Sequence, residues 1–166
     1  MPFTLALIPL LLFPWSSPHG GERTDNRHIG EWRLRTNTDA FSGQLTCRLS
    51  ANHIEYGRGV LTFHLDRRVD TTNAVYRVDD GVPVTVRSEI MDMARRGFAV
   101  YQDDLANPSG GLVRIPEGRL LKARAVAIEA APKGPIAVFK VAGFAAALDA
   151  ASKAGCSSAT YDRDAP

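Results

Sequence analysis

The first 21 residues contain no aspartate, glutamate, lysine or arginine, although these four types make up 23% of the whole chain. Within this segment an apolar stretch runs from Phe3 to Phe13. A membrane-spanning helix needs roughly 20 apolar residues, so this stretch predicts no transmembrane span. The alternative of a buried N-terminal strand or helix is disfavoured, because Pro9 and Pro14 would interrupt its backbone hydrogen bonds. The stretch has a length typical of a secretory signal peptide, so we expect residues 1–21 to be a signal peptide.

Cysteine is scarce, with only Cys47 and Cys156 in 166 residues. Cys47 lies in the stretch QLTCRLS, where it shares the apolar side of an alternating strand with Leu45 and Leu49. Cys156 follows Gly155, which suits the left-handed position that ends a helix and turns the next side chain back toward the core. Two cysteines of an exported protein usually pair. We therefore predict a disulfide between them; the alternative is two buried free thiols.

Sequence motifs of known chemistry are absent. The formal net charge is only +2 and no run of lysine or arginine occurs, which predicts no nucleic-acid partner. The chain has no G-x-S-x-G elbow, no G-x-G-x-x-G and no G-x-x-x-x-G-K-[ST] loop. We predict no catalytic residue and no cofactor, and an enzyme with a site assembled from scattered residues stays open as an alternative. Arg67, Arg68 and Arg77 are interpreted as part of a solvated sheet face rather than an anion-binding patch.

Two of the four histidines, His53 and His64, lie in one hairpin and would suit a metal ion if they faced each other. We place a three-residue loop at residues 57–59, which pairs His53 with Phe63. Neighbouring residues of a strand point to opposite faces, so this register predicts that the two imidazoles lie on opposite sides of the ribbon. We therefore predict no metal site.

Apolar residues alternate with polar ones through most of the chain, which predicts seven to nine short strands. Pro83 cannot donate a backbone hydrogen bond, so its strand is expected at a sheet edge. The spacing changes to that of a helix from Ser88 to a stop at Gly97, and again from Phe144 to Gly155. This order predicts a mainly β fold, a β-sandwich or open barrel, with a short middle helix and a C-terminal helix packed on the sheet.

The length suffices for one domain. We place this single β-rich domain at residues 28–156, with a flexible lead-in at residues 22–27 and a tail at residues 157–166. The clearest loop is DDLANPSGG, residues 103–111, whose composition is typical of turns. It supplies the candidate binding residues Asp103, Asp104, Asn107 and Ser109.

Three stretches resemble the invasion-associated locus B family of exported bacterial proteins. They are GEWRLR with Trp32, LTCRLS with Cys47, and IAVFKV leading into AGFAAALDAA. In the last stretch the matching residues are Gly143, Phe144, Ala147 and Leu148. The resemblance implies a periplasmic or envelope β-rich domain and carries over no catalytic residue.

Together these features predict an exported, non-enzymatic bacterial protein, periplasmic or secreted, that binds another protein or an envelope component. A second interpretation is a small periplasmic inhibitor of a host or rival enzyme that presents the loop at residues 103–111. An enzyme would need a deep pocket with convergent polar groups, whereas a binding protein would expose an apolar patch or a protruding loop.

Overall fold

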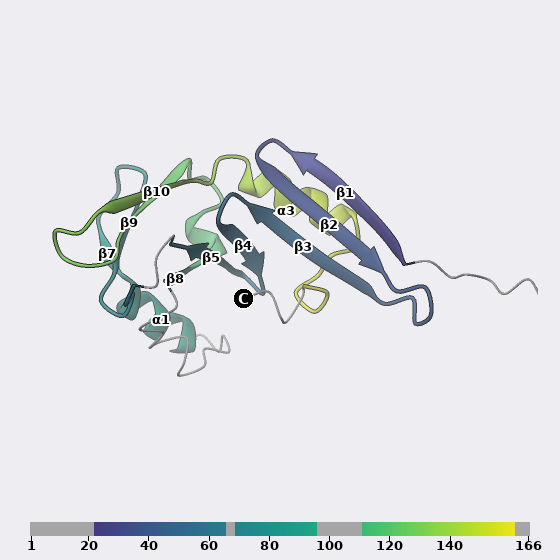
Figure 1. Cartoon of the computed structure of the whole chain (residues 1–166), viewed down its shortest axis with the longest axis horizontal. Helices are drawn as coiled ribbons and strands as arrows, with labels where there is room; N and C mark the ends of the chain where they lie inside the picture. Colours follow the sequence, from purple (N-terminus) through teal and green to yellow (C-terminus); the bar gives the residue numbers. More distant parts are fainter. Residues whose placement is uncertain (1–21, 66–68, 96–110, 162–166) are drawn as a thin grey trace, which may run out of the picture.

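Two stacked antiparallel sheets make up most of the computed structural model, which describes residues 22–65, 69–95 and 111–161 (Figure 1). The larger sheet has the strand order β1-β2-β3-β4-β5-β8, and the smaller one has the order β10-β9-β6-β7. The larger sheet comprises Arg23–Ile29 (β1), Trp32–Thr38 (β2), Leu45–Ala51 (β3), Ile54–Gly57 (β4), Val60–His64 (β5) and Leu112–Pro116 (β8). The predicted mainly β class is confirmed, and the two sheets are consistent with a β-sandwich.

The smaller sheet and the helices complete the described chain. The strands are Val75–Val78 (β6), Val84–Thr85 (β7), Ala125–Glu129 (β9) and Ile136–Lys140 (β10). The helices are Val86–Arg95 (α1), the 3-10 turn Glu117–Arg119 (η1) and Phe144–Lys153 (α3). Strand β7 is outermost in its sheet, which confirms the edge position predicted from Pro83. Helix α3 packs on the larger sheet, mainly against β2 and β3, as predicted for the C-terminal helix (Figure 1).

Alternation of apolar and polar residues determines which face of each strand is buried. Trp32 and Leu34 are buried in β2 while Arg33 and Arg35 between and after them are exposed, as predicted. The register places Leu34 opposite Leu49 of β3, so both strands present their apolar residues to the same side. That side is the one covered by α3.

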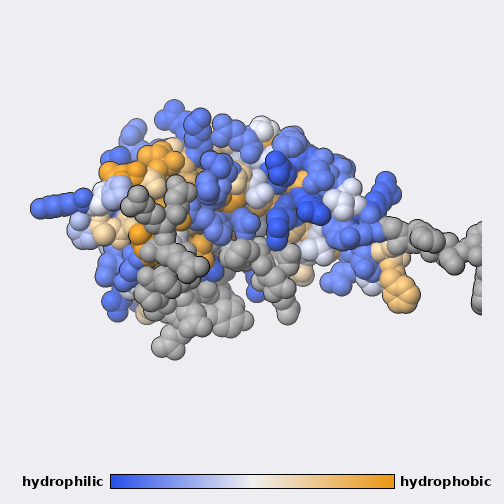
Figure 2. All heavy atoms as spheres, in the orientation of Figure 1, coloured by the Kyte–Doolittle hydropathy of each residue, from blue (hydrophilic) through white to orange (hydrophobic). Residues whose placement is uncertain are grey.

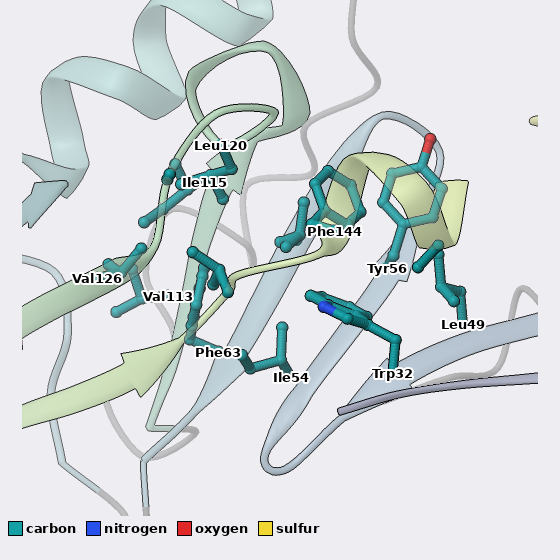
Figure 3. Close-up of a cluster of buried hydrophobic side chains, with 14 of the residues drawn as sticks. Trp32, Leu49, Ile54, Tyr56, Phe63, Val113, Ile115, Leu120, Val126 and Phe144 are labelled. Atoms are coloured by element: carbon teal, nitrogen blue, oxygen red, sulfur yellow. The ribbon is translucent and has the colours of Figure 1, made fainter. Parts of the chain in front are cut away.

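Aromatic side chains join the sheets and α3 into one core (Figure 3). The ring of Phe144, the first residue of α3, lies 5.1 Å from Trp32 and 5.4 Å from Tyr56, measured between ring centroids. Phe63 of β5 meets Phe139 of β10 at 5.2 Å, which brings the edge of the smaller sheet onto the larger one. Burying such side chains stabilises the fold by roughly 1.5–3 kcal/mol each.

Both predicted ends of the domain are wrong. Residues 22–27, expected to be a flexible lead-in, contribute most of β1, which pairs with β2 along its whole length from Arg23 to Ile29. The expected tail is packed at least as far as Tyr161, which is only 5% exposed and bridges to Cys47 in parallel. In addition, the backbone N–H of Cys47 donates to the carbonyl of Thr160 at 2.8 Å. The domain therefore includes at least residues 23–161.

Helix α1 begins two residues before the predicted start at Ser88. The reason is Thr85, whose hydroxyl oxygen accepts a hydrogen bond from the backbone N–H of Ser88 at 3.4 Å, in the manner of an N-cap residue. The hydroxyl of Ser88 in turn donates to the Thr85 carbonyl at 2.8 Å. Ser88 therefore supports the first turn from inside the helix, and the predicted end at Gly97 lies outside the described residues.

Candidate functional site

The C-terminal helix ends as predicted and leads into the disulfide. Gly155 adopts a φ of 90°, and its N–H donates to the Ser152 carbonyl at 3.0 Å. The N–H of Cys156 donates to the Ala151 carbonyl at 3.0 Å, which completes a Schellman motif. This turn carries Cys156 to the buried Cys47, and the two residues are bonded with a Cα–Cα distance of 6.0 Å. The predicted Cys47–Cys156 pair is therefore confirmed.

The register predicted for the histidine hairpin is wrong. The β4–β5 turn has two residues, Arg58 and Gly59, with φ angles of 51° and 83°, and Gly57 pairs with Val60. Both positive angles are those of the turn type that matches the twist of paired strands. Phe63 is consequently opposite Ile54 rather than His53.

The two histidines are close together instead of on opposite sides of the ribbon. His53 belongs to the two-residue turn between β3 and β4, and its carbonyl accepts a hydrogen bond from the N–H of His64 at 2.9 Å. Both residues line the same pocket. Among the described residues no three histidine, cysteine, aspartate or glutamate side chains come together as metal ligands.

The pocket that these histidines line has a volume of about 480 Å³ and forms a groove between the two sheets. One wall is β10, and the other is made by the β1–β2 turn, the β3–β4 turn and the end of β5. The lining residues are Glu31, Asn52, His53, His64, Leu65, Ala137, Val138, Phe139 and Lys140. Lys140 and Glu31 approach each other across the groove, with 3.7 Å between the ammonium nitrogen and a carboxylate oxygen.

Strand β10 exposes apolar side chains beside this groove. It is outermost in the smaller sheet among the described strands, so its outer backbone edge has no strand neighbour there. Ile136 is 62% exposed and Val138 is 67% exposed, both on the face turned away from the core. Figure 2 shows hydrophobic residues gathered over β9 and β10 at the upper left. An apolar edge strand is a ready template for pairing with another chain, and proteins usually protect such edges with charge, proline or a bulge.

The polar side chains of the groove lining are those of Glu31, Asn52, His53, His64 and Lys140. The described lining contains no serine, threonine or cysteine, so it offers no hydroxyl or thiol nucleophile. The imidazole Nε2 of His64 lies 3.8 Å from a carboxylate oxygen of Glu55, and neither buried atom has a hydrogen-bond partner. Both atoms are buried and Glu55 lies outside the groove lining, so this pair supplies no free polar group to the groove.

Two further polar clusters are structural rather than part of the groove. Glu89 of α1 is only 2% exposed; it accepts hydrogen bonds from the Tyr76 hydroxyl at 3.0 Å and from Nε of Arg119 at 2.9 Å. Burial, together with the charge of Glu89, raises the pKa of Tyr76. The hydroxyl of Tyr56 donates to Glu117 at 2.5 Å, and burial is again the main reason that the Tyr56 pKa is raised. Both clusters fix η1 to its neighbours.

The residues predicted as a binding loop, Asp103, Asp104, Asn107 and Ser109, lie outside the described residues. Arg67 and Arg68 do so as well, whereas Arg77 is exposed on β6. Sequence reasoning missed the groove, because its walls come from turns and a strand that are far apart in the chain. The available signal was the short apolar stretch IAVFKV next to the turn APKGP.

Comparison of the chain with protein-family models, with curated proteins and with solved structures finds no match. The resemblance to the invasion-associated locus B family therefore stays a prediction. None of the described helices has the length and apolar character that crossing a membrane requires.

Proposed function

We propose that this protein is an exported, non-enzymatic binding domain that recognises an extended segment of another protein along β10. The observation that carries the proposal is the exposed, apolar edge of β10 beside the groove. An added strand would gain backbone hydrogen bonds from β10 and apolar contacts from Ile136 and Val138. The groove would receive side chains from the opposite face of that strand, since successive residues of a strand alternate in direction.

Export is supported by the uncharged apolar N-terminus, and the Cys47–Cys156 disulfide is compatible with an extracytoplasmic location. Intact-mass measurement of the protein purified from its native host tests this part. We expect the loss of about 15 to 25 residues from the N-terminus, which is the usual length of a signal peptide. A full-length species confined to the cytosol would contradict it.

Binding along β10 is tested by a photoreactive amino acid at position 138, activated in envelope preparations of the native host. We expect one discrete protein adduct, because Val138 lies at the centre of the edge. The same probe at Phe41, which is fully exposed on the β2–β3 loop, is the matched control and should give no such adduct. The substitution Ile136→Lys should suppress the adduct at 138. Equal labelling at both positions, or none at 138, would reject the proposed surface.

A further inference from the structure

Strand β10 has one row of backbone groups that its own sheet does not use. Its register to β9 continues beyond Lys140 to Val141, whose N–H donates to the Arg124 carbonyl at 2.9 Å. Hydrogen-bonded and non-hydrogen-bonded pairs alternate along an antiparallel ladder, so Ala137 and Phe139 also bond to β9. The N–H and C=O groups of the residues between them therefore point to the outer edge, where the described chain has no strand. These residues are Ile136, Val138 and Lys140.

The same three residues place their side chains on the outer face of the smaller sheet, where all of them are exposed. Directly opposite residues of paired strands share a face, so the register puts three β9 residues beside them. In the same order these are Glu129, Ala127 and Ala125. The outer face of β9 and β10 thus has an apolar centre, an acid beside the start of β10 and a base at its end (Figure 2).

The edge of β10 has little of the protection that edge strands usually carry. Prolines, bulges and charges keep such edges from pairing with other chains, yet β10 contains no proline or bulge, and its only charge is Lys140 at its end. The groove separates this edge from the turns of the larger sheet. The ion pair Lys140–Glu31 that crosses the groove joins two largely exposed side chains, and such pairs contribute little. Lys140 can therefore exchange Glu31 for another carboxylate.

The sequence of β10 is complementary to itself in an antiparallel pair centred on Val138. In that register Val138 lies opposite Val138 of a second copy, and Ile136 lies opposite Lys140 of the second copy. Each of these pairs exchanges two backbone hydrogen bonds, because the residues involved are those whose N–H and C=O groups point outward. The two lysines are roughly 13 Å apart along the strands, so no like charges lie opposite each other. Val138 and Ala127 of both copies form an apolar row across the axis.

The continued sheet also brings opposite charges together. The outer-face row of Glu129 and Ile136 continues with Lys140 of the second copy. Glu129 and that lysine are two strand spacings apart, roughly 10 Å between their backbones, which the two side chains can span over Ile136. One carboxylate oxygen of Glu129 accepts from the N–H of Lys133 at 2.5 Å, which leaves the second oxygen for the lysine. The symmetry repeats this ion pair at the other end of the strand pair.

We propose that β10 pairs antiparallel with β10 of a second copy of this chain, centred on Val138, and that this homodimer is the resting state of the edge. The inference rests on the function proposed above, because it assigns the resting occupant of the same binding edge. One edge accepts one added strand, so the partner segment and the second copy exclude each other. Self-pairing keeps the apolar edge covered until a partner segment displaces it. The assembly closes at two copies, because the same edge is used by both chains around a two-fold axis.

Cysteine cross-linking of the purified chain tests the register. At the axis the two copies of Val138→Cys lie about 5.5 Å apart between Cα atoms, which a disulfide can bridge, so mild oxidation should join them. The variants Ile136→Cys and Lys140→Cys should each give no cross-link alone, because their copies are about 13 Å apart, but a mixture of the two variants should form one. The native disulfide is kept in every variant, and peptide mass mapping identifies which cysteines are joined.

Sedimentation equilibrium measures the dimer of the purified chain from about 1 µM to about 1 mM, the range that so small an interface permits. Val138→Pro is the disrupting variant. The N–H of residue 138 points away from its own sheet, so the monomer tolerates proline there. The dimer loses both hydrogen bonds at its axis and should weaken about 30-fold. Melting temperature establishes that the variant is folded; if it is not, Val138→Lys replaces it, since it puts like charges opposite each other.

The ion pairs are tested in the same measurement. Lys140→Gln and Glu129→Gln should each weaken the dimer by up to about fivefold, and the double variant should weaken it no more than either change alone. The control Lys153→Gln removes an exposed lysine from α3, on the larger sheet, and should leave dimerisation unchanged.

The homodimer is overturned if the chain stays monomeric at about 1 mM, if Ile136→Cys alone cross-links as readily as Val138→Cys, or if Val138→Pro dimerises as well as the control. The two proposals fail separately. A dimer of the purified chain without an adduct to another protein at position 138 in envelope preparations would reject the proposed function alone. Such an adduct, from a chain that is monomeric when purified, would reject the homodimer alone.

Discussion

Reduction of the Cys47–Cys156 disulfide should lower the free energy of unfolding by a few kcal/mol. The bond joins residues 109 positions apart, and in the chain-entropy model a closed loop of that length removes roughly 4 to 5 kcal/mol of unfolded-state entropy at 25 °C. Both residues are buried, Cys47 at 1% exposure and Cys156 at 8%. For a domain of this size a loss of 4 to 5 kcal/mol corresponds to a fall in Tm of about 15 °C. The effect is smaller if the reduced unfolded chain keeps residual structure.

Thermal unfolding followed by circular dichroism, with and without reductant, measures this change. The variant Cys47→Ala, Cys156→Ala is the control: it should melt near the reduced protein, apart from a small packing loss, and reductant should not affect it. Near-ultraviolet dichroism should also fall on reduction, because the ring of Tyr161 packs edge-on against Tyr56 at 4.9 Å beside the bond. Two titratable thiols in unfolded protein from the native host, or equal Tm values with and without reductant, would refute the reasoning.

Three further outcomes follow from the contacts. The substitution Gly155→Ala should lower the free energy of unfolding by about 1–2 kcal/mol in chemical denaturation, because the position needs a φ of 90°. The control Gly118→Ala should lower it little, because an added Cβ there meets no atom within 4 Å. Equal losses would contradict the helix-stop argument. The substitution Arg119→Ala should lower the free energy of unfolding by about 3 kcal/mol in the same assay, because it removes the charged partner of the buried Glu89. A loss below about 1 kcal/mol would mean that the carboxylate finds other partners. Burial, with a smaller effect of a nearby carboxylate, raises the pKa of Tyr161 to about 12. This pKa exceeds the value of about 10 in the unfolded chain, so the contribution of Tyr161 to the free energy of unfolding is complete below pH 10 and is lost as the pH rises toward 12. If the ring were exposed, phenolate absorbance would show titration near pH 10.

Strands with one buried face could be predicted from the sequence, and strands without one could not. In β2 and β3 the apolar residues alternate because one side meets α3, so Trp32, Leu34 and Cys47 were placed correctly on the core face. Strand β1 is an edge strand whose residues are exposed up to His28, so it contains no alternation to detect. Its polar sequence is therefore indistinguishable from that of a flexible lead-in.

The groove could not be predicted because it depends on backbone geometry and on long-range contacts. A two-residue β4–β5 turn requires Arg58 at a φ of 51°, which non-glycine residues rarely adopt, so the sequence favours the three-residue loop. That difference of one residue decides which face every later side chain of β5 occupies. The approach of β10 to the turns of the larger sheet rests on contacts such as Phe63–Phe139, between residues 76 positions apart.

The single pair of cysteines has a consequence for how the chain matures. Cys47 lies in the third strand, and its partner follows the last helix, so the bond cannot form until almost all of the domain has been synthesised. Within one chain no wrong pairing is available to correct, because two cysteines allow only one connectivity. An oxidising compartment therefore needs to supply only an oxidant, and no isomerase, to complete this protein. During maturation, however, the unpaired Cys47 thiols of two molecules could form an intermolecular disulfide.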